Sequence, residues 1–310
     1  MGLKGHLRSA KLDVLKRGNF AIAVPRVLPS ARKSTRGAKI RIAMAVLTSE
    51  AVVLRIWPVH ESDLIVSFFT RDYGRMRGVA KAALKSRKRF GGALEPMTVA
   101  KAWFAEKPRQ ELVRLDQLEI VRSPLSAPVD QARMAALSFF AEVLDEALPE
   151  RDPQDAVFRL LVSVLEQTTA TQKDQAQSFT NGAVAVGQPV SGPWMALTYF
   201  SLWMTRLMGL LPDLAHCITC GEALSAGETW FHHDSDGLVC GLHRGANASR
   251  LSADSWTFAQ KMLKSPVGSF AGEPWPRRRG QDLRRFTLQT IERHLEKKLR
   301  TGEALARLGG

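Results

Sequence analysis

The chain has 310 residues and carries 44 lysines and arginines against 30 aspartates and glutamates, a formal net charge of +14. Apolar residues make up 45% and charged residues 24%, a composition that indicates a folded globular protein and excludes a disordered one. No apolar run approaches the ~20 residues that cross a bilayer, and three cysteines are too few for a disulfide scaffold. The length suggests two domains, or one domain with attachments. The positive charge suggests a polyanionic partner, with nucleic acid first and an anionic membrane second.

Residues 1–43 are the most basic part of the chain, with eleven basic residues and one acidic residue. They follow neither the helical nor the strand period, so we expect them to be disordered. Three interpretations stay open: a basic arm for nucleic acid, a targeting presequence, or an upstream start codon with Met44 as the real first residue. The net charge is +5 over 44–125, −6 over 126–269 and +5 over 270–310.

Five strands are expected between residues 44 and 125. The runs that predict them are Ala51–Trp57, Leu64–Thr70, Arg75–Ala80, Thr98–Phe104 and Glu111–Val121. The turn signal Asp72-Tyr73-Gly74 separates the second run from the third. Short strands without a long helix between them favour a small closed barrel, and the OB-fold is the obvious candidate with five strands.

A cluster of basic residues lies within this strand-rich region, with Asp72 as its single acid. Its members are Arg71, Arg75, Arg77, Lys81, Lys85, Arg87, Lys88 and Arg89. Arg75 and Arg77 would project from one face of a strand, because the side-chain period is two. The run 85–92 indicates a flexible basic loop with an aromatic residue, Phe90, which suits single-stranded nucleic acid. The alternative is a solvated loop, but mutual repulsion of the cations favours phosphate binding.

Helical periodicity predicts three helices after the strands. They are expected over Gln131–Leu148, from Asp152-Pro153 onward, and from Pro193 to a stop at Gly209. Residues 168–192 are rich in Thr, Gln, Ser and Gly and indicate a loop or a weak helix.

All three cysteines fall in one window, as Cys217-x-x-Cys220 and Cys240-x-x-His243. Two such knuckles supply the four soft or borderline ligands of a tetrahedral zinc ion, and four protein ligands indicate a structural rather than a catalytic site. A redox C-x-x-C pair with an unrelated third cysteine is the alternative. The imidazoles of His216, His232 and His233 lie nearby in the sequence, either as substitute ligands or simply as exposed groups.

The C-terminal segment Asp282–Leu299 predicts a helix with an apolar inner face and a basic outer face. It is either a capping helix with a solvated face or a second DNA contact. The residues proposed for that contact are Arg284, Arg285, Lys297 and Lys298. The sequence lacks the motifs of P-loop nucleotide hydrolases, dinucleotide-binding folds, H-E-x-x-H metalloproteases and G-x-S-x-G hydrolases, so no enzyme is expected.

From Met44 onward the chain resembles the family of the bacterial recombination mediator RecO, over about 260 residues. The stretches that carry the resemblance are Glu50–Arg55, Glu61–Asp63, Phe69–Arg75, Gly78–Lys81, Gly209–Leu214 running into the Cys217 knuckle with Gly221, and His294–Leu299. No single stretch is decisive. The strand and turn that end in Gly-Arg, together with the Pro-Asp-Leu sequence that precedes the first cysteine, are specific for this family in combination.

The resemblance implies an α+β protein, with an OB-fold barrel over 44–125 and a helical domain over 126–310 that holds a zinc module at 214–245. It also implies a DNA repair function without ATP or bond chemistry, in the cytoplasm at the nucleoid. Such proteins anneal complementary strands and help load recombinase onto DNA coated by single-strand-binding protein.

The implied partners are single- and double-stranded DNA, a RecR-like protein and single-strand-binding protein, with no membrane. Many zinc-bearing members of the family carry a fourth cysteine where this chain has His243, and some members lack the metal. An RNA-associated assembly factor and a zinc-dependent nucleic-acid enzyme are the alternative functions.

Overall fold

The chain divides into two units, residues 1–42 and residues 43–310, and everything described below belongs to the second. The computed structural model describes residues 45–106, 110–126, 130–169 and 192–308. The disordered leader expected at 1–43, and most of the loop or weak helix expected at 168–192, lie outside the described residues.

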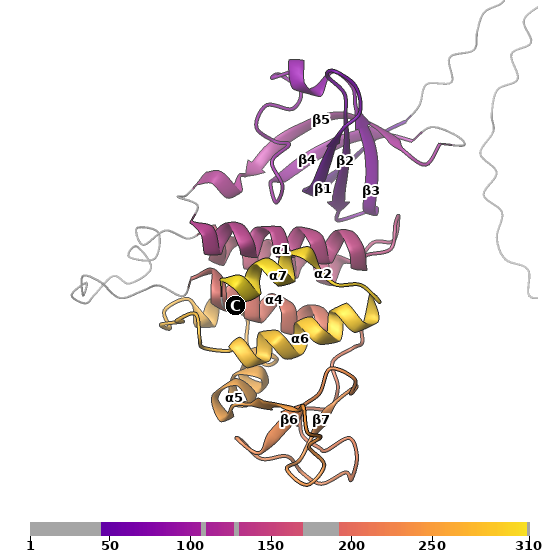
Figure 1. The fold of residues 1–310 in the computed structure, drawn as a ribbon. Coiled ribbons are helices and arrows are strands. Elements are labelled where there is room, and N and C mark those ends of the chain that lie inside the picture. Colours follow the sequence, from indigo (N-terminus) through magenta and orange to yellow (C-terminus); the bar gives the residue numbers. More distant parts are fainter. Residues whose placement is uncertain (1–44, 107–109, 127–129, 170–191, 309–310) are drawn as a thin grey trace, which may run out of the picture. The chain divides into compact units, whose positions relative to one another are not determined.

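Five strands close into a barrel in the order β1-β2-β3-β5-β4 (Figure 1). They are β1 (Val46–Pro58), β2 (Leu64–Thr70), β3 (Gly74–Ala80), β4 (Val99–Ala105) and β5 (Val113–Arg122). The long β1 closes the barrel because it pairs with β4 through its first half and with β2 through its second half. β3 and β5 pair in parallel, and the other neighbours are antiparallel. The prediction of five strands is confirmed, with boundaries that differ by a few residues.

The alternation of side chains along β2 divides them between two hydrophobic cores. Leu64, Val66 and Phe68 point into the barrel and belong to its core. Phe69 is on the opposite face and belongs to the core of the helical part, where its ring meets Phe158 edge-on at 5.5 Å. The outer face of β2 is therefore packed against the helices and is not exposed to solvent.

A buried carboxylate on the first helix, α1 (Gln131–Ala147), fixes this packing. Asp145 accepts a hydrogen bond from the Ser67 hydroxyl at 2.6 Å and lies 3.4 Å from Arg55 and 3.8 Å from Arg75. Asp145 is near the C-terminal end of α1, where the helix dipole disfavours negative charge. The two arginines of the barrel offset that unfavourable position, so the barrel and α1 stabilise one another.

Gly74 shows why the turn between β2 and β3 needs glycine. Its φ is +72°, and a Cβ at this position would overlap the backbone of Asp152. The Arg151 N–H also donates to the Arg75 carbonyl at 2.9 Å. The turn therefore packs directly on the connection that follows α1.

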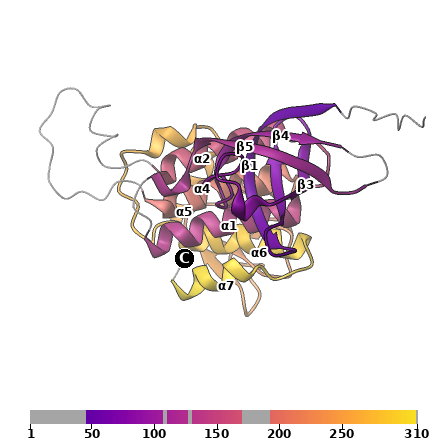
Figure 2. The same ribbon diagram turned by 90° about the horizontal axis from the view of Figure 1, so that it is seen from above.

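The helices of the second part pack together around apolar side chains (Figures 1 and 2). Besides α1 they are α2 (Asp155–Thr169), α4 (Pro193–Leu207), α5 (Ala253–Met262), α6 (Gln281–His294) and α7 (Arg300–Arg307). Short 3₁₀ turns are η1 (Ala83–Lys85), η2 (Pro124–Ser126) and η3 (Val267–Phe270). Phe140 and Phe200 meet at the centre with ring centroids 4.5 Å apart. Among the described helices, none is both long and apolar enough to cross a membrane.

Two helix boundaries differ from the prediction. α2 begins at Asp155, because Asp152 and Pro153 belong to the connection that packs on Gly74. The helix expected over Asp282–Leu299 is α6, and it ends at His294, not at Leu299. Glu296 takes a left-handed conformation there, and the Glu292 side chain accepts a hydrogen bond from the Leu299 N–H at 2.9 Å.

A small three-stranded sheet lies between α4 and α6 in the sequence. Its strands are ordered β7-β6-β8, with β6 (Thr229–Phe231), β7 (Leu238–Val239) and β8 (Ser249–Leu251). Phe231 packs on Phe286 of α6 with ring centroids 5.3 Å apart. The sheet holds the second cysteine knuckle, which begins directly after β7.

We expect Asp145→Asn to lower the free energy of unfolding by about 3 kcal/mol, because the buried Ser67 hydroxyl loses its charged acceptor and Arg55 and Arg75 each lose one of their two carboxylate neighbours. Glu146→Gln is the matched control: Glu146 is more exposed and pairs with Lys297 at 2.7 Å, so its loss should cost less than about 1 kcal/mol. Urea unfolding of both variants measures the difference. Equal destabilisation would contradict the role given to Asp145.

Candidate metal centre and nucleic-acid interface

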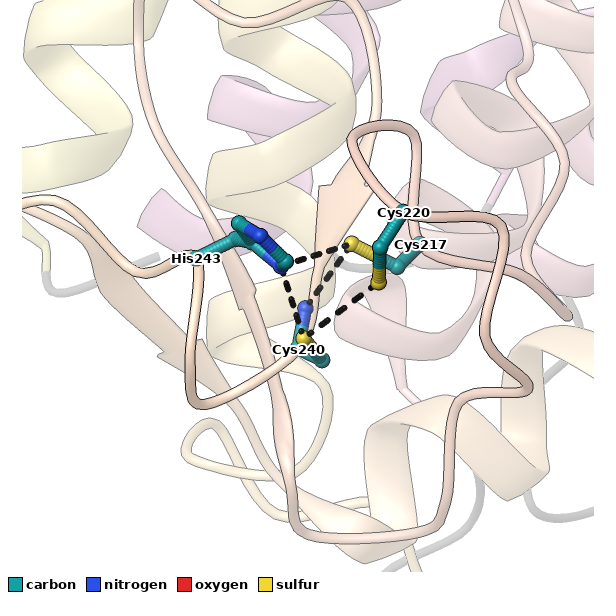
Figure 3. A group of neighbouring side chains, drawn as sticks. All are labelled: Cys217, Cys220, Cys240 and His243. Atoms are coloured by element: carbon teal, nitrogen blue, oxygen red, sulfur yellow. Dashed lines mark hydrogen bonds between the residues drawn. The ribbon is translucent and has the colours of Figure 1, made fainter.

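The structure brings Cys217, Cys220, Cys240 and His243 together, as the knuckle spacing predicts. Figure 3 shows their side chains converging from two loops. The Sγ atoms and the imidazole nitrogen all lie within 4.8 Å of one another. Cys217 is buried, whereas Cys220 and His243 are exposed, so the cluster lies at the surface with one side closed by protein.

The separations between these atoms fit a tetrahedral metal ion. Cys220 Sγ and Cys240 Sγ are 3.9 Å apart, and His243 Nδ1 lies 3.9 Å from Cys217 Sγ and 3.2 Å from Cys240 Sγ. Zinc with Zn–S near 2.3 Å and Zn–N near 2.0 Å would place its ligand atoms about 3.5–3.8 Å apart. The four residues therefore pass the geometric test for a metal site.

Each knuckle is held in shape by its own backbone. The Gly221 N–H donates to the Cys217 carbonyl at 2.9 Å, and Gly221 has φ +76°, which favours glycine. In the second knuckle the His243 N–H donates to the Cys240 carbonyl at 3.1 Å. The Ile218 N–H also bonds to the Leu238 carbonyl of β7 at 2.9 Å, which ties the first knuckle to the strand that leads to the second.

The surroundings of Cys217 favour its thiolate. Burial opposes ionisation, but backbone N–H groups of Cys220, Cys240 and Thr219 outweigh it and lower the pKa of the Cys217 thiol to about 6. The hydrogen bond between Cys240 and His243 lowers the pKa of the Cys240 thiol and raises that of the imidazole. Burial and the neighbouring thiols of Cys217 and Cys240 raise the pKa of the Cys220 thiol. Thiolates are the form that binds a metal, so Cys217 and Cys240 are the donors that the protein itself prepares for a soft or borderline cation.

The basic cluster of the barrel divides into two groups. The first faces the helical part: Arg71 pairs with Asp155 at 3.0 Å, and Arg77 pairs with Glu150 at 3.2 Å. Arg75 is only 7% exposed, donates to the Leu148 carbonyl at 2.9 Å and lies 3.3 Å from Glu150. Arg75 and Arg77 do share a strand face, but the helical part closes that face at Arg75, whereas Arg77 stays exposed. The expectation that Arg75 is open to phosphate is therefore corrected.

The turn region after β3 is more ordered than the flexible loop expected there. Arg89 donates to the Ser86 hydroxyl at 3.0 Å and to the Lys81 carbonyl at 2.6 Å, so it braces the segment. Phe90 is 1% exposed and belongs to the barrel core. The Phe90 ring therefore cannot stack on a base, which corrects that part of the prediction. Although Phe90 stands beside cations in the sequence, its side chain packs inside the barrel.

The second group keeps its charge exposed. Lys81, Lys85, Arg87 and Lys88 are all exposed. Within residues 45–308, as far as they are described, the structure gives none of these four side chains a carboxylate partner. Arg89 holds the backbone between them, so four cations lie on an ordered segment without local neutralisation.

The possible second DNA contact is not a continuous basic face. Arg284 is 4% exposed, stacks over the Trp194 ring and donates to Thr198 at 2.9 Å, and burial lowers the pKa of its guanidinium to about 10. Lys297 pairs with Glu146 and Lys298 pairs with Glu292, each at 2.7 Å.

Of the four residues predicted for this contact, only Arg285 has an exposed side chain with no carboxylate partner in the described part of the chain. The structure therefore corrects the expectation for Arg284. The sequence period could not reveal that this arginine lies on the inner face with Trp194.

Sequence reasoning missed the carboxylates that divide the basic cluster. Asp145, Glu150 and Asp155 are 70 to 84 residues from their arginine partners in the sequence. Charge counting within one segment cannot find such pairs. The only sequence signal for these ion pairs was that an acidic segment follows the basic barrel segment along the chain.

Comparison with known proteins gives the family. The family described as "Recombination protein O N terminal" matches residues 44–124, and "Recombination protein O C terminal" matches residues 129–181 and 185–303.

Relatives cover most of the chain. The DNA repair protein RecO of Koribacter versatilis (strain Ellin345) is 49% identical over 260 residues, which is 84% of this chain and 98% of the relative. The protein of the same name from Anaeromyxobacter dehalogenans (strain 2CP-C) is 30% identical over 83% of this chain and 95% of its own length. With both family halves matched in order and a barrel and helical part to carry them, the chain belongs to the RecO family of DNA repair proteins.

Proposed function

We propose that the chain is a recombination mediator of DNA repair that works by binding and annealing DNA, without catalysing bond chemistry. One observation supports the binding step most directly: Lys81, Lys85, Arg87 and Lys88 are exposed on an ordered segment of the barrel and have no carboxylate partner among the described residues. In the proposed reaction the chain helps load recombinase onto DNA coated by single-strand-binding protein, with a RecR-like partner, in the cytoplasm at the nucleoid.

Annealing follows from charge. Two complementary strands repel one another through their phosphates, and a protein that neutralises phosphates on both lowers that barrier. Lysine and arginine side chains without a local partner contribute most to this neutralisation, because no ion pair within the protein must first be broken. The exposed arginines Arg71 and Arg77 contribute less, since each already pairs with a carboxylate of the helical part.

The proposed domain division follows the matched family halves. We infer an OB-fold over 44–125 and a helical domain over 126–310, with the metal module at 214–245. The barrel order β1-β2-β3-β5-β4 and its five strands support the OB-fold assignment.

The resident metal is proposed to be one structural zinc ion held by Cys217, Cys220, Cys240 and His243. Three thiolates and one imidazole complete a tetrahedral shell and leave no open position for a substrate. Bound zinc would supply a cross-link between two loops. The chain's own contribution is the pair of backbone-stabilised knuckles and the packing of the small sheet on α6.

Removing the four unpaired cations should flatten the salt dependence of binding to single-stranded DNA. In the variant Lys81→Ala/Lys85→Ala/Arg87→Ala/Lys88→Ala, the slope of log affinity against log salt should change by about 2.8, because each phosphate contact on a single strand contributes about 0.7. Fluorescence anisotropy with a labelled oligonucleotide between low and moderate salt measures it. Arg89 is kept, because it braces the segment.

The matched control removes four exposed cations from the helical domain that were not predicted to contact DNA, as Lys264→Ala/Arg277→Ala/Arg278→Ala/Arg300→Ala. The control and the barrel variant lose the same number of positive charges. An effect on the slope that both variants share therefore reports net charge alone. We expect this control to leave the slope nearly unchanged. A larger effect in the control than in the barrel variant would place the main contact on the helical domain and contradict the proposal.

Annealing itself is testable without ATP. Two complementary oligonucleotides, one with a fluorophore and one with a quencher, should pair faster with the protein than alone, and the barrel variant should lose most of the acceleration. No acceleration by the unchanged chain would refute the annealing function. Faster pairing of RNA strands only would favour the RNA-associated alternative, and cleaved products would favour the enzyme.

The zinc proposal predicts one ion per chain, lost in Cys217→Ser. Cys217 is the buried ligand, so its loss removes the donor that closes the inner side of the site. Thr219→Ala is the control, because Thr219 lies in the same knuckle and offers no ligand atom. Elemental analysis of the purified, untagged chains measures the ratio; zinc retained in full by Cys217→Ser would exclude this ligand set.

A further inference from the structure

A second group of metal-ligating side chains lies in the loop that joins β6 to β7. His232, His233 and Asp234 follow β6 directly, and β7 then leads to the cysteine cluster. Their ligand atoms all lie within 4.8 Å of one another. None of the three belongs to the Cys₃His cluster, so this group has no role in the site already described.

The carboxylate of Asp234 lies between the two imidazoles. One oxygen is 3.0 Å from His233 Nε2, and the other is 3.6 Å from His232 Nδ1. The two rings are close, with centroids 4.3 Å apart. Two imidazoles so near one another are disfavoured if both are protonated, because like charges repel, whereas a shared cation suits both as neutral ligands.

The single lone pair of His232 Nδ1 accepts a hydrogen bond within the loop. The Asp234 backbone N–H donates to His232 Nδ1 at 3.2 Å, so this nitrogen is the unprotonated one. A bound cation would take over that lone pair in place of the backbone hydrogen bond. His232 Nδ1 is therefore the ring nitrogen that would offer its electron pair to a cation, and it lies 3.6 Å from an oxygen of the Asp234 carboxylate.

Arg293 of α6 holds the loop in this shape. It donates to the carbonyls of His233 and Ser235 at 3.0 and 2.6 Å, and it pairs with Asp236 at 2.8 Å. These three contacts fix the backbone on both sides of Asp234. They also neutralise Asp236, so the negative charge that remains in the loop is the one beside the imidazoles.

We propose that His232, His233 and Asp234 form a second, exchangeable site for a divalent transition metal ion. Two imidazoles and one carboxylate are ligands that zinc, cobalt and nickel accept. Three protein ligands leave further coordination positions to water, and His233 and Asp234 are exposed, so the ion enters and leaves from solvent. This site binds less tightly than the cysteine cluster and is independent of the DNA-binding function.

The test adds cobalt(II) to the full-length, untagged chain after its cysteine cluster has been loaded with zinc. We expect one equivalent of cobalt to bind by equilibrium dialysis, with visible d–d absorption and without thiolate charge-transfer bands. His233→Asn and Asp234→Asn should each abolish that equivalent while the zinc content stays at one.

His216→Asn is the matched control. His216 pairs with Asp213 at 2.6 Å, which is the same imidazole–carboxylate contact without a third ligand, so its loss should leave cobalt binding unchanged. The proposal is overturned if the zinc-loaded chain binds no cobalt, if binding persists in His233→Asn, or if thiolate bands show that cobalt has entered the cysteine cluster instead.

Discussion

The buried carboxylate of Asp145 is the interaction on which the arrangement of barrel and helices depends. It lies at the unfavourable C-terminal end of α1 and is surrounded by groups of the barrel: the Ser67 hydroxyl, Arg55 and Arg75. The barrel groups stabilise the carboxylate in that position, and the carboxylate, together with Glu150, stabilises the charge of the buried Arg75. Phe69 of the barrel also packs on Phe158 of α2. Polar and apolar contacts therefore hold the barrel against the helices in the same arrangement.

This docking decides which cations of the barrel remain available. The outer face of β2 and β3 is the surface with which OB-folds commonly bind oligonucleotides, but here Asp145 and Glu150 occupy it. The positive charge that stays available lies on the segment after β3. There the side chains without a carboxylate partner among the described residues are Lys81, Lys85, Arg87 and Lys88. The docking therefore uses Arg75, whereas the DNA contact that we propose would use other arginines and lysines of the same basic run.

Local pattern was sufficient for the strands, the knuckles and most helices, because each depends on neighbours in sequence. The period of two located β2 and β3, and the two C-x-x-C/H spacings located all four residues of the cluster. The errors arose where a residue's environment comes from distant segments. Phe90 packs in the barrel core, and Arg284 stacks over the Trp194 ring. Neither contact leaves a trace in local spacing.

The small sheet joins two metal-ligating groups through very little structure. β7 has two residues, with the imidazole loop before it and the second cysteine knuckle after it. A sheet this small cannot bury enough apolar surface to hold itself together, so its order must come from its borders. Phe231 on Phe286 supplies one such border and Arg293 another, both from α6. Metal cross-linking at the knuckles would supply the third, on the side where His243 and Cys220 are exposed.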